Sequence, residues 1–203
     1  MKILRATTVC AVLFTSLSAF AGIGESRAEP GKTDFDPQRF ELAVESGYLF
    51  GFINPPRSYQ IGAEFITARV RWGVLRSDSW LRGYNQFYVS AVAEPILQGI
   101  ENRYFGFNFG SRYNFVQPGS RFVPYISGGV GLGWIDSHAN IPGGEGQDFT
   151  FNILTAAGVS YKVNDQWNVN VGILYQHLSN GGQTDPNPSL NLIGPQLGLT
   201  YSF

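Results

Sequence analysis

Cysteine and charged residues are scarce in this chain. The single cysteine, Cys10, lies in an N-terminal segment that we expect to be removed, which leaves no disulfide and no thiol nucleophile. Charged residues make up 14% of the chain, against about 25% in a typical soluble domain. Beyond the N-terminal segment there is no run of 18 apolar residues, so no transmembrane helix is expected. Two histidines without cysteine give no zinc ligand set, and we expect neither a metal nor a cofactor.

The N-terminus has the pattern of a secretory signal peptide. Basic residues Lys2 and Arg5 precede a short apolar stretch, and small residues permit cleavage after Ala21 or Ala28. A retained anchor is the alternative. Loss of residues 1–28 takes 3 of the 14 basic and 1 of the 15 acidic side chains, which leaves 11 and 14 and a net charge of −3. A chain with this balance is not expected to bind nucleic acid.

Aromatic residues and glycine are abundant instead. The chain has 16 Phe, 10 Tyr, 4 Trp and 25 Gly, a composition that suits a membrane β-barrel with an apolar outer wall and a narrow lumen. Residues 29–203 divide into runs in which every second residue is apolar, separated by Gly, Pro, Asn and Asp. The eight expected strands are 40–52, 59–72, 83–95, 103–115, 122–135, 149–163, 167–180 and 191–203.

An even number of strands lets an antiparallel barrel close, as a bilayer requires. We therefore predict an all-β fold: one eight-stranded antiparallel transmembrane barrel of the bacterial outer-membrane type. The alternative is a soluble barrel of the lipocalin type, but the residues opposite the apolar face are rich in Gly, Asn and Ser and suit a tight lumen better than a solvated exterior. The terminal Phe203 resembles the C-terminal signature of outer-membrane barrels.

The second strand is less regular than the others. Its apolar face is expected to comprise Tyr59, Ile61, Ala63 and Phe65, and its alternation slips around residues 66–70, where a β-bulge is possible.

Several charged residues are expected to face the lumen. They are Glu41, Glu45, Glu64, Glu94 and Arg112, and we interpret them as a buried ion network, because buried charges must be paired. Asp136, Glu145 and Asp148 near a glycine-rich loop could bind calcium, although solvated loop charge is the favoured interpretation.

Two reactive side chains continue the apolar face of the seventh strand. After Trp167, Val169, Val171, Ile173 and Tyr175, the next two positions are His177 and Ser179. Residues i and i+2 share a face about 6.6 Å apart along a strand, so the imidazole and the hydroxyl can touch. The pair Ser137-His138 fails this test, because adjacent residues point to opposite faces.

The hairpin that follows could complete a hydrolytic site. Asn191 has the same outward parity on the eighth strand and is expected within reach of His177. Ser179 would attack an ester carbonyl, His177 would transfer its proton, and Asn191 would orient the imidazole. The Asn180 or Asn187 side chains, or the amides of Gly181 and Gly182, would stabilise the oxyanion. The alternative is a polar girdle that only ends the strand.

The segment His177-Leu178-Ser179-Asn180-Gly181-Gly182, followed by Pro186-Asn187-Pro188 and Asn191, resembles the lipid A 3-O-deacylase (PagL) family. The resemblance implies an outer-membrane enzyme that removes the ester-linked 3-hydroxyacyl chain of lipid A, with Ser179 as nucleophile and His177 as base. It also places Gly182 and Asn187 in the region of the oxyanion hole. The third member in the family is Glu, where this chain has Asn191; the nearby Asp185 could substitute.

The expected partners are lipid A or lipopolysaccharide and the outer membrane, with the protein a monomer or homodimer. Three other functions remain open: a non-catalytic barrel that serves as adhesin, anchor or pore, a family member that has lost activity, and an acyltransferase.

Overall fold

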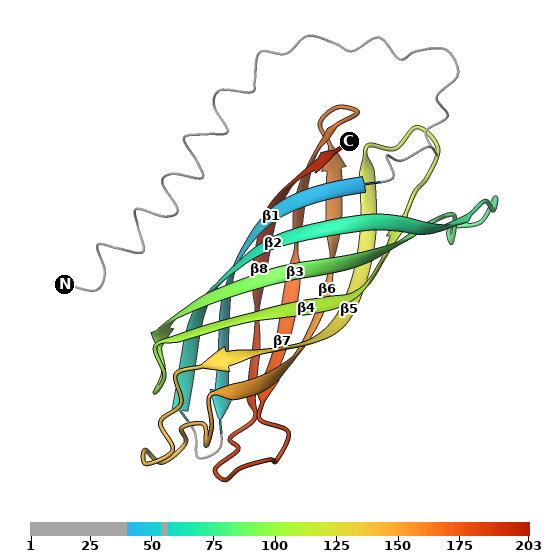
Figure 1. The fold of residues 1–203 in the computed structure, drawn as a ribbon. Helices are drawn as coiled ribbons and strands as arrows, with labels where there is room; N and C mark the ends of the chain where they lie inside the picture. Colours follow the sequence, from blue (N-terminus) through green and yellow to red (C-terminus); the bar gives the residue numbers. More distant parts are fainter. Residues whose placement is uncertain (1–39, 54–56) are drawn as a thin grey trace. The chain divides into compact units, whose positions relative to one another are not determined.

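The computed structural model describes residues 40–53 and 57–203, which form eight antiparallel strands (Figure 1). Their bounds are β1 Phe40–Ile53, β2 Arg57–Leu75, β3 Gly83–Gln98, β4 Arg103–Phe115, β5 Phe122–Ile135, β6 Phe149–Lys162, β7 Trp167–Ser179 and β8 Leu190–Ser202. Each strand pairs with its neighbours in sequence, and β8 pairs with β1, so the sheet is a closed barrel. The predicted fold class is confirmed. The predicted signal peptide, residues 1–28, lies outside the described residues.

The barrel closes with a stagger. Following the register from Leu42 through each successive strand leads to His177 on β7, then to Asn191 on β8, and returns to β1 at Phe52, ten residues beyond the start. Such a stagger tilts the strands against the barrel axis, as Figure 1 shows. The long β5–β6 and β7–β8 loops lie at one end of the barrel, here called the loop end. Within the described residues, no helix is long and apolar enough to cross a membrane.

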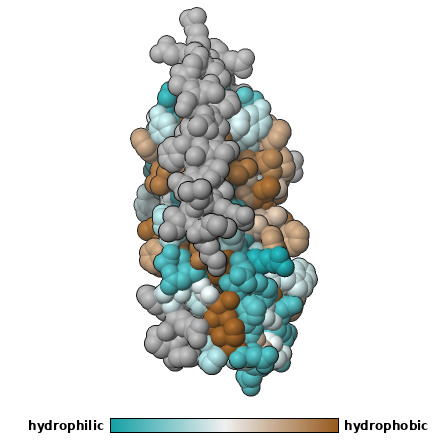
Figure 2. All heavy atoms as spheres, turned by 90° about the vertical axis from the view of Figure 1, so that its left-hand side faces the viewer, coloured by the Kyte–Doolittle hydropathy of each residue, from teal (hydrophilic) through white to brown (hydrophobic). Residues whose placement is uncertain are grey.

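The outer wall of the barrel is apolar. Large outward-facing side chains are about half exposed on every strand, among them Phe107, Val130 and Ile173. Aromatic pairs mark the end opposite the loops, with ring centroids 5.3 Å apart for Phe40 and Phe203 and 4.9 Å apart for Trp167 and Tyr201. Figure 2 shows one face of the molecule, with hydrophilic residues gathered toward the loop end. Apolar walls with aromatic rims are those of a barrel that spans a bilayer.

The lumen half nearest the termini is polar. Arg69 Nη2 lies 2.6 Å from Glu45 Oε1, and Thr67 donates a hydrogen bond to the other oxygen of Glu45. Arg112 lies 3.6 Å from the ring centroid of Tyr125 and donates to Ser160. Among the described lumen residues, the expected ion network is therefore one ion pair embedded in hydrogen bonds, and Glu94 instead accepts from the amide of Gln176.

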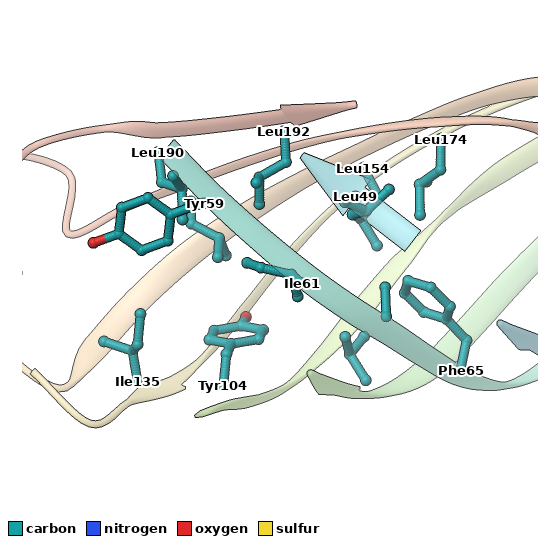
Figure 3. Close-up of a cluster of buried hydrophobic side chains, with 13 residues drawn as sticks. Leu49, Tyr59, Ile61, Phe65, Tyr104, Ile135, Leu154, Leu174, Leu190 and Leu192 are labelled. Carbon is teal, nitrogen blue, oxygen red and sulfur yellow. The ribbon is translucent and has the colours of Figure 1, made fainter. Parts of the chain in front are cut away.

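The lumen half at the loop end is apolar, which the sequence interpretation did not foresee. Figure 3 shows this cluster, in which Leu49, Ile61, Tyr104, Leu178 and Leu192 are at most 1% exposed. This apolar plug also encloses the hydrogen-bonded pair Glu94 and Gln176, whose strand partners Tyr104 and Leu192 belong to it. It lies beneath the loops.

The apolar plug overturns the predicted face of the second strand. Tyr59, Ile61, Ala63 and Phe65 are all buried, and they point into the lumen instead of toward lipid. The pairing of β1 with β2 runs without interruption from Phe40–Val70 to Ile53–Arg57, so the expected bulge at residues 66–70 is absent there. The register shifts of β2 lie against β3, at Gln60/Ile61 and Arg71/Gly73. The apolar side chains change face because the lumen changes from apolar to polar along the barrel.

The same change of face corrects the position of one carboxylate. Glu41, Glu45, Glu94 and Arg112 lie in the lumen as expected, and all four are buried. Glu64 instead has the outward parity of Ile66, because its β1 partner is the outward-facing Ser46.

Candidate functional site

The end of β7 presents a row of outward-facing side chains at the loop end. Tyr175, His177 and Ser179 alternate with the buried residues Gln176 and Leu178. The alternation follows from the pleat of a strand whose inner face packs into the apolar plug. His177 and Ser179 are partly exposed on the outer wall, as the sequence predicts.

The three predicted polar residues are in contact. His177 Nε2 lies 3.2 Å from Ser179 Oγ, and His177 Nδ1 lies 2.9 Å from Asn191 Oδ1. The cross-strand pairing of His177 with Asn191 produces the second contact. The hairpin therefore brings a hydroxyl, an imidazole and an amide into one line on the outside of the barrel.

The amide of Asn191 determines which imidazole nitrogen carries the proton. Its Nδ2 donates to the carbonyl of Ser189 at 2.9 Å, so the atom facing His177 is the acceptor Oδ1. His177 Nδ1 must then donate. In the neutral imidazole this leaves Nε2 without a proton, so that it can accept the proton of the Ser179 hydroxyl. Ser189 holds its carbonyl there from a left-handed backbone conformation, with φ of 53°.

Tyr175 is a further member of this cluster. Its hydroxyl donates to Asn191 Oδ1 at 2.7 Å, so the same oxygen accepts from both Tyr175 and His177. The sequence interpretation counted Tyr175 only as part of the apolar face. Tyr175 carries a hydroxyl and lies two residues before His177 on the same face of the strand, and this spacing could have identified it as a member of the cluster.

The β7–β8 loop is held by the side chain of Asn180, which is fully buried. Its Nδ2 donates to the carbonyls of Thr184 and Pro186 at 2.8 and 3.2 Å, and its Oδ1 accepts from Gly182 N at 2.9 Å. Both functions of this amide are thus used within the loop. Asn180 shapes the loop, and its donors are occupied in this structure.

Two of the predicted oxyanion donors remain unoccupied within the described chain: the backbone N–H of Gly181 and Nδ2 of Asn187. Asn187 Oδ1 accepts from Asn180 N at 3.2 Å, which fixes the amide plane. Gly181 has φ of 69°, and a Cβ there would come within 3.1 Å of the Phe151 ring. A glycine is therefore required where the chain turns past this ring.

The β5–β6 loop packs against the β7–β8 loop. Gly146 N donates to the Pro186 carbonyl at 2.8 Å, and the amide of Gln147 exchanges hydrogen bonds with Gln183 and Thr184. The loop that carries the candidate site is therefore held by its own Asn180 side chain and by the β5–β6 loop. This favours a preorganised site.

A buried carboxylate pair lies beneath these loops. Glu101 Oε2 accepts from the Tyr59 hydroxyl and its Oε1 accepts from Glu145 N, while both carboxylate oxygens of Glu145 are buried without a hydrogen-bond donor. Burial, and then repulsion from Glu101, raises the pKa of Glu145 to about 7.

We predict that the packing of these loops weakens as the pH rises. A carboxyl whose pKa is raised by folding contributes stability that is full below its unfolded pKa of about 4.3 and is lost as the pH passes through its folded value. Amides of residues 180–187 should exchange hydrogen more slowly at pH 5.5 than at pH 8, after correction for intrinsic rates. Glu145→Gln should remove this difference, and an unchanged difference in that variant would assign the effect to another group.

The other predicted loop residues have structural partners. Asp136 accepts from Asn102 and from the backbone of Arg103. Ser137 donates from its backbone and hydroxyl to Asp148 and so lowers the pKa of that carboxyl. The Ser137 hydroxyl is therefore engaged with Asp148. In the described part of the chain, no group of three or more His, Cys, Asp or Glu residues is placed to hold a metal.

The surroundings of the site are apolar on the barrel wall and polar at the loops. Phe151 and Ile153 of β6 pair with Ser179 and His177, and Ile193 of β8 pairs with Tyr175. An aligned hydroxyl, imidazole and amide next to free N–H donors can perform nucleophilic acyl chemistry. Its position suits a substrate with a polar head at the loops and chains along the wall.

Comparison with known proteins agrees with the fold and identifies a family. Neisserial surface protein A (NspA) has a TM-score of 0.59 and 14% identity, covering 81% of this chain and 97% of that one. The outer membrane enzyme PagL has a TM-score of 0.52 and 15% identity, covering 78% and 97%. No curated protein sequence matches. The family model for lipid A 3-O-deacylase (PagL) matches residues 59–200, which include most of β2 and β8, all strands between them and the whole candidate site. Since this match spans well over half of the chain, the protein belongs to the lipid A 3-O-deacylase (PagL) family.

Proposed function

We propose that this protein is a lipid A deacylase of the outer membrane that hydrolyses an ester-linked 3-hydroxyacyl chain. The observation that carries the proposal is the contact of His177 with both Ser179 and Asn191 on the lipid-facing wall. Membership of the PagL family supports the substrate class. The position at the loop end of the barrel would give the site access to the boundary between sugar and acyl chains.

The proposed reaction has two steps. Ser179 Oγ attacks the ester carbonyl carbon while His177 Nε2 takes the hydroxyl proton, and the resulting oxyanion is met by the Gly181 N–H and Asn187 Nδ2. The ester C–O bond then breaks, and His177 returns the proton to the leaving sugar oxygen. Water, deprotonated by His177, then attacks the acyl carbonyl carbon; the bond from that carbon to Ser179 Oγ breaks, the hydroxy fatty acid leaves, and His177 returns the proton to Ser179 Oγ. Gly182 and Asn180 hold the loop that positions these donors.

Expression of the full chain in a Gram-negative host without such activity tests the proposal. Mass spectrometry of its lipid A should show loss of one hydroxyacyl chain together with the free hydroxy fatty acid. Transfer of the chain to another acceptor would indicate an acyltransferase. Unchanged lipid A from a folded, membrane-inserted protein would favour the non-catalytic barrel.

Replacement of Asn191 tests its proposed role as the group that orients His177. Asn191→Leu removes the acceptor for Nδ1–H, so the imidazole loses its tautomer preference, and we expect kcat to fall by about 10²–10³-fold. Asn191→Glu adds a charge that stabilises the imidazolium, and we expect kcat to rise by about tenfold.

The readout is release of hydroxy fatty acid from purified lipid A in detergent micelles, with Asp185→Asn as the matched control. Asp185 is exposed in the loop, and its replacement should leave kcat unchanged. A large loss in Asp185→Asn with little change in Asn191→Leu would transfer the orienting role to Asp185.

A further inference from the structure

A groove of about 530 Å³ lies on the outer wall, away from the candidate site. It runs over β1 to β5, whereas the site occupies β6 to β8. Its lining includes Glu64, Ile66, Ala91, Ala93, Phe105 and Phe107. Trp134 is one residue from the loop end of β5, and Val44 lies in the first half of β1, so the groove extends from the loop end toward the membrane interior.

The groove exists because outward positions on β3 carry small side chains. Ala91 and Ala93 stand between Ile66 on one side and the rings of Phe105 and Phe107 on the other. These flanking side chains are about half exposed, so they form two ridges with a floor of methyl groups between them. A hollow of this kind on a lipid-facing wall fits one extended hydrocarbon chain.

Glu64 places a carboxyl group at this groove. It faces outward and is partly exposed, and the Ser46 hydroxyl donates to its Oε1 at 2.9 Å. Within the described chain, Oε2 receives no hydrogen bond. Ser46 is the seventh of the 14 residues of β1, so the pair lies near the middle of the strand, where an ionisable residue is costly and commonly functional.

The unused oxygen of Glu64 restricts what can occupy the groove. If the carboxyl is ionised, Oε2 needs a donor, and if it is neutral, its O–H needs an acceptor. A hydroxyl group provides both. Unsubstituted hydrocarbon provides neither, and ester carbonyls of ordinary phospholipids lie near the membrane surface instead of at mid-strand depth.

We propose that this groove is a second, non-catalytic lipid site that binds an acyl chain carrying a hydroxyl group, with Glu64 and Ser46 as the recognition pair. The chain lies on the floor of Ala91 and Ala93, and its hydroxyl bonds Oε2 of Glu64. The occupant is a free fatty acid whose hydroxyl lies in mid-chain, at the depth of Glu64. The site stands independently of the hydrolytic function, because it shares none of its residues.

Tryptophan fluorescence can test the site, because Trp134 lines the groove while Trp72, Trp80 and Trp167 lie toward the opposite end. A Ser179→Ala chain with these three replaced by Phe is placed in nanodiscs of brominated phosphatidylcholine, whose chains quench Trp134. Added 12-hydroxyoctadecanoic acid, whose hydroxyl lies in mid-chain, should displace the quencher and restore emission at a concentration at least fivefold lower than octadecanoic acid does.

Three variants identify the groove as the origin of this preference. Glu64→Leu should abolish the difference between the two acids, and Glu64→Gln, whose amide donates and accepts, should retain part of it. Ala93→Phe fills the floor and should prevent displacement by either acid. Equal concentrations for the two acids, or a preference that survives Glu64→Leu, would overturn the proposal. So would a change of Ala93→Phe from dimer to monomer in sedimentation, because a second copy would then occupy the groove.

Discussion

Ser179→Ala is expected to lower deacylation of lipid A by at least about 10³-fold and to leave the barrel folded. The hydroxyl is the only nucleophile in contact with His177 in the described structure, so its loss removes the covalent step. The side chain is only partly buried and makes no contact that closes the barrel, so folding should be unaffected. The measurement is release of hydroxy fatty acid by the purified variant, alongside heat-modified migration in electrophoresis as a measure of folding.

A serine elsewhere on the barrel provides the matched control. Ser137 donates to Asp148 in the neighbouring loop, and Ser137→Ala should retain activity within about twofold. Deacylation by Ser179→Ala at the unmodified rate would assign the chemistry to another residue. A folded Ser179→Ala protein without activity would agree with the proposed nucleophile and would leave the groove at Glu64 unaffected.

Arg69→Met is expected to destabilise the barrel by about 3–5 kcal/mol. Arg69 and Glu45 are 4% and 7% exposed and lie 2.6 Å apart, so removing the guanidinium leaves a buried carboxylate without its counter-charge. Thr67 alone would remain as a donor to that carboxylate. Urea unfolding in lipid vesicles, followed by tryptophan emission, measures the change.

Two variants separate loss of the ion pair from loss of side-chain volume. Glu45→Gln combined with Arg69→Met removes both charges and should recover most of the lost stability, since two neutral groups carry a smaller burial penalty. Arg121→Met, at an exposed position, should change stability by less than about 0.5 kcal/mol. Equal destabilisation in the single and double variants would mean that packing, not charge, dominates at Arg69.

The strand pattern was predictable because a membrane barrel imposes the same rule along most of its wall. Outward positions such as Phe107 and Val130 must be apolar, and a period of two identifies them without tertiary information. The reactive pair was also predictable, because His177 and Ser179 share one strand and a spacing of two. Asn191 required only that the hairpin keep both apolar faces on the same side.

The second strand shows where the pattern fails. Ile61 and Phe65 are apolar because they fill the lumen plug, whereas Ile66 and Val70 are apolar because they face lipid. An alternating pattern shows that the two faces of a strand differ, but not which of them faces outward. Before Phe65 the apolar residues of this strand face the lumen, and after it they face the lipid. The prediction that Glu64 faces the lumen was wrong for that reason.

The sequence by itself determined the number of strands, the apolar wall and the shared face of the imidazole and the hydroxyl, because each depends on spacing within one strand or one hairpin. Only the tertiary structure decided that Arg69 neutralises Glu45, that Tyr175 and Ser189 fix the amide of Asn191, and that Asn180 is occupied in holding its loop. These contacts depend on the stagger at which the barrel closes and on how two loops meet, and residues distant in sequence carry no local signal of either.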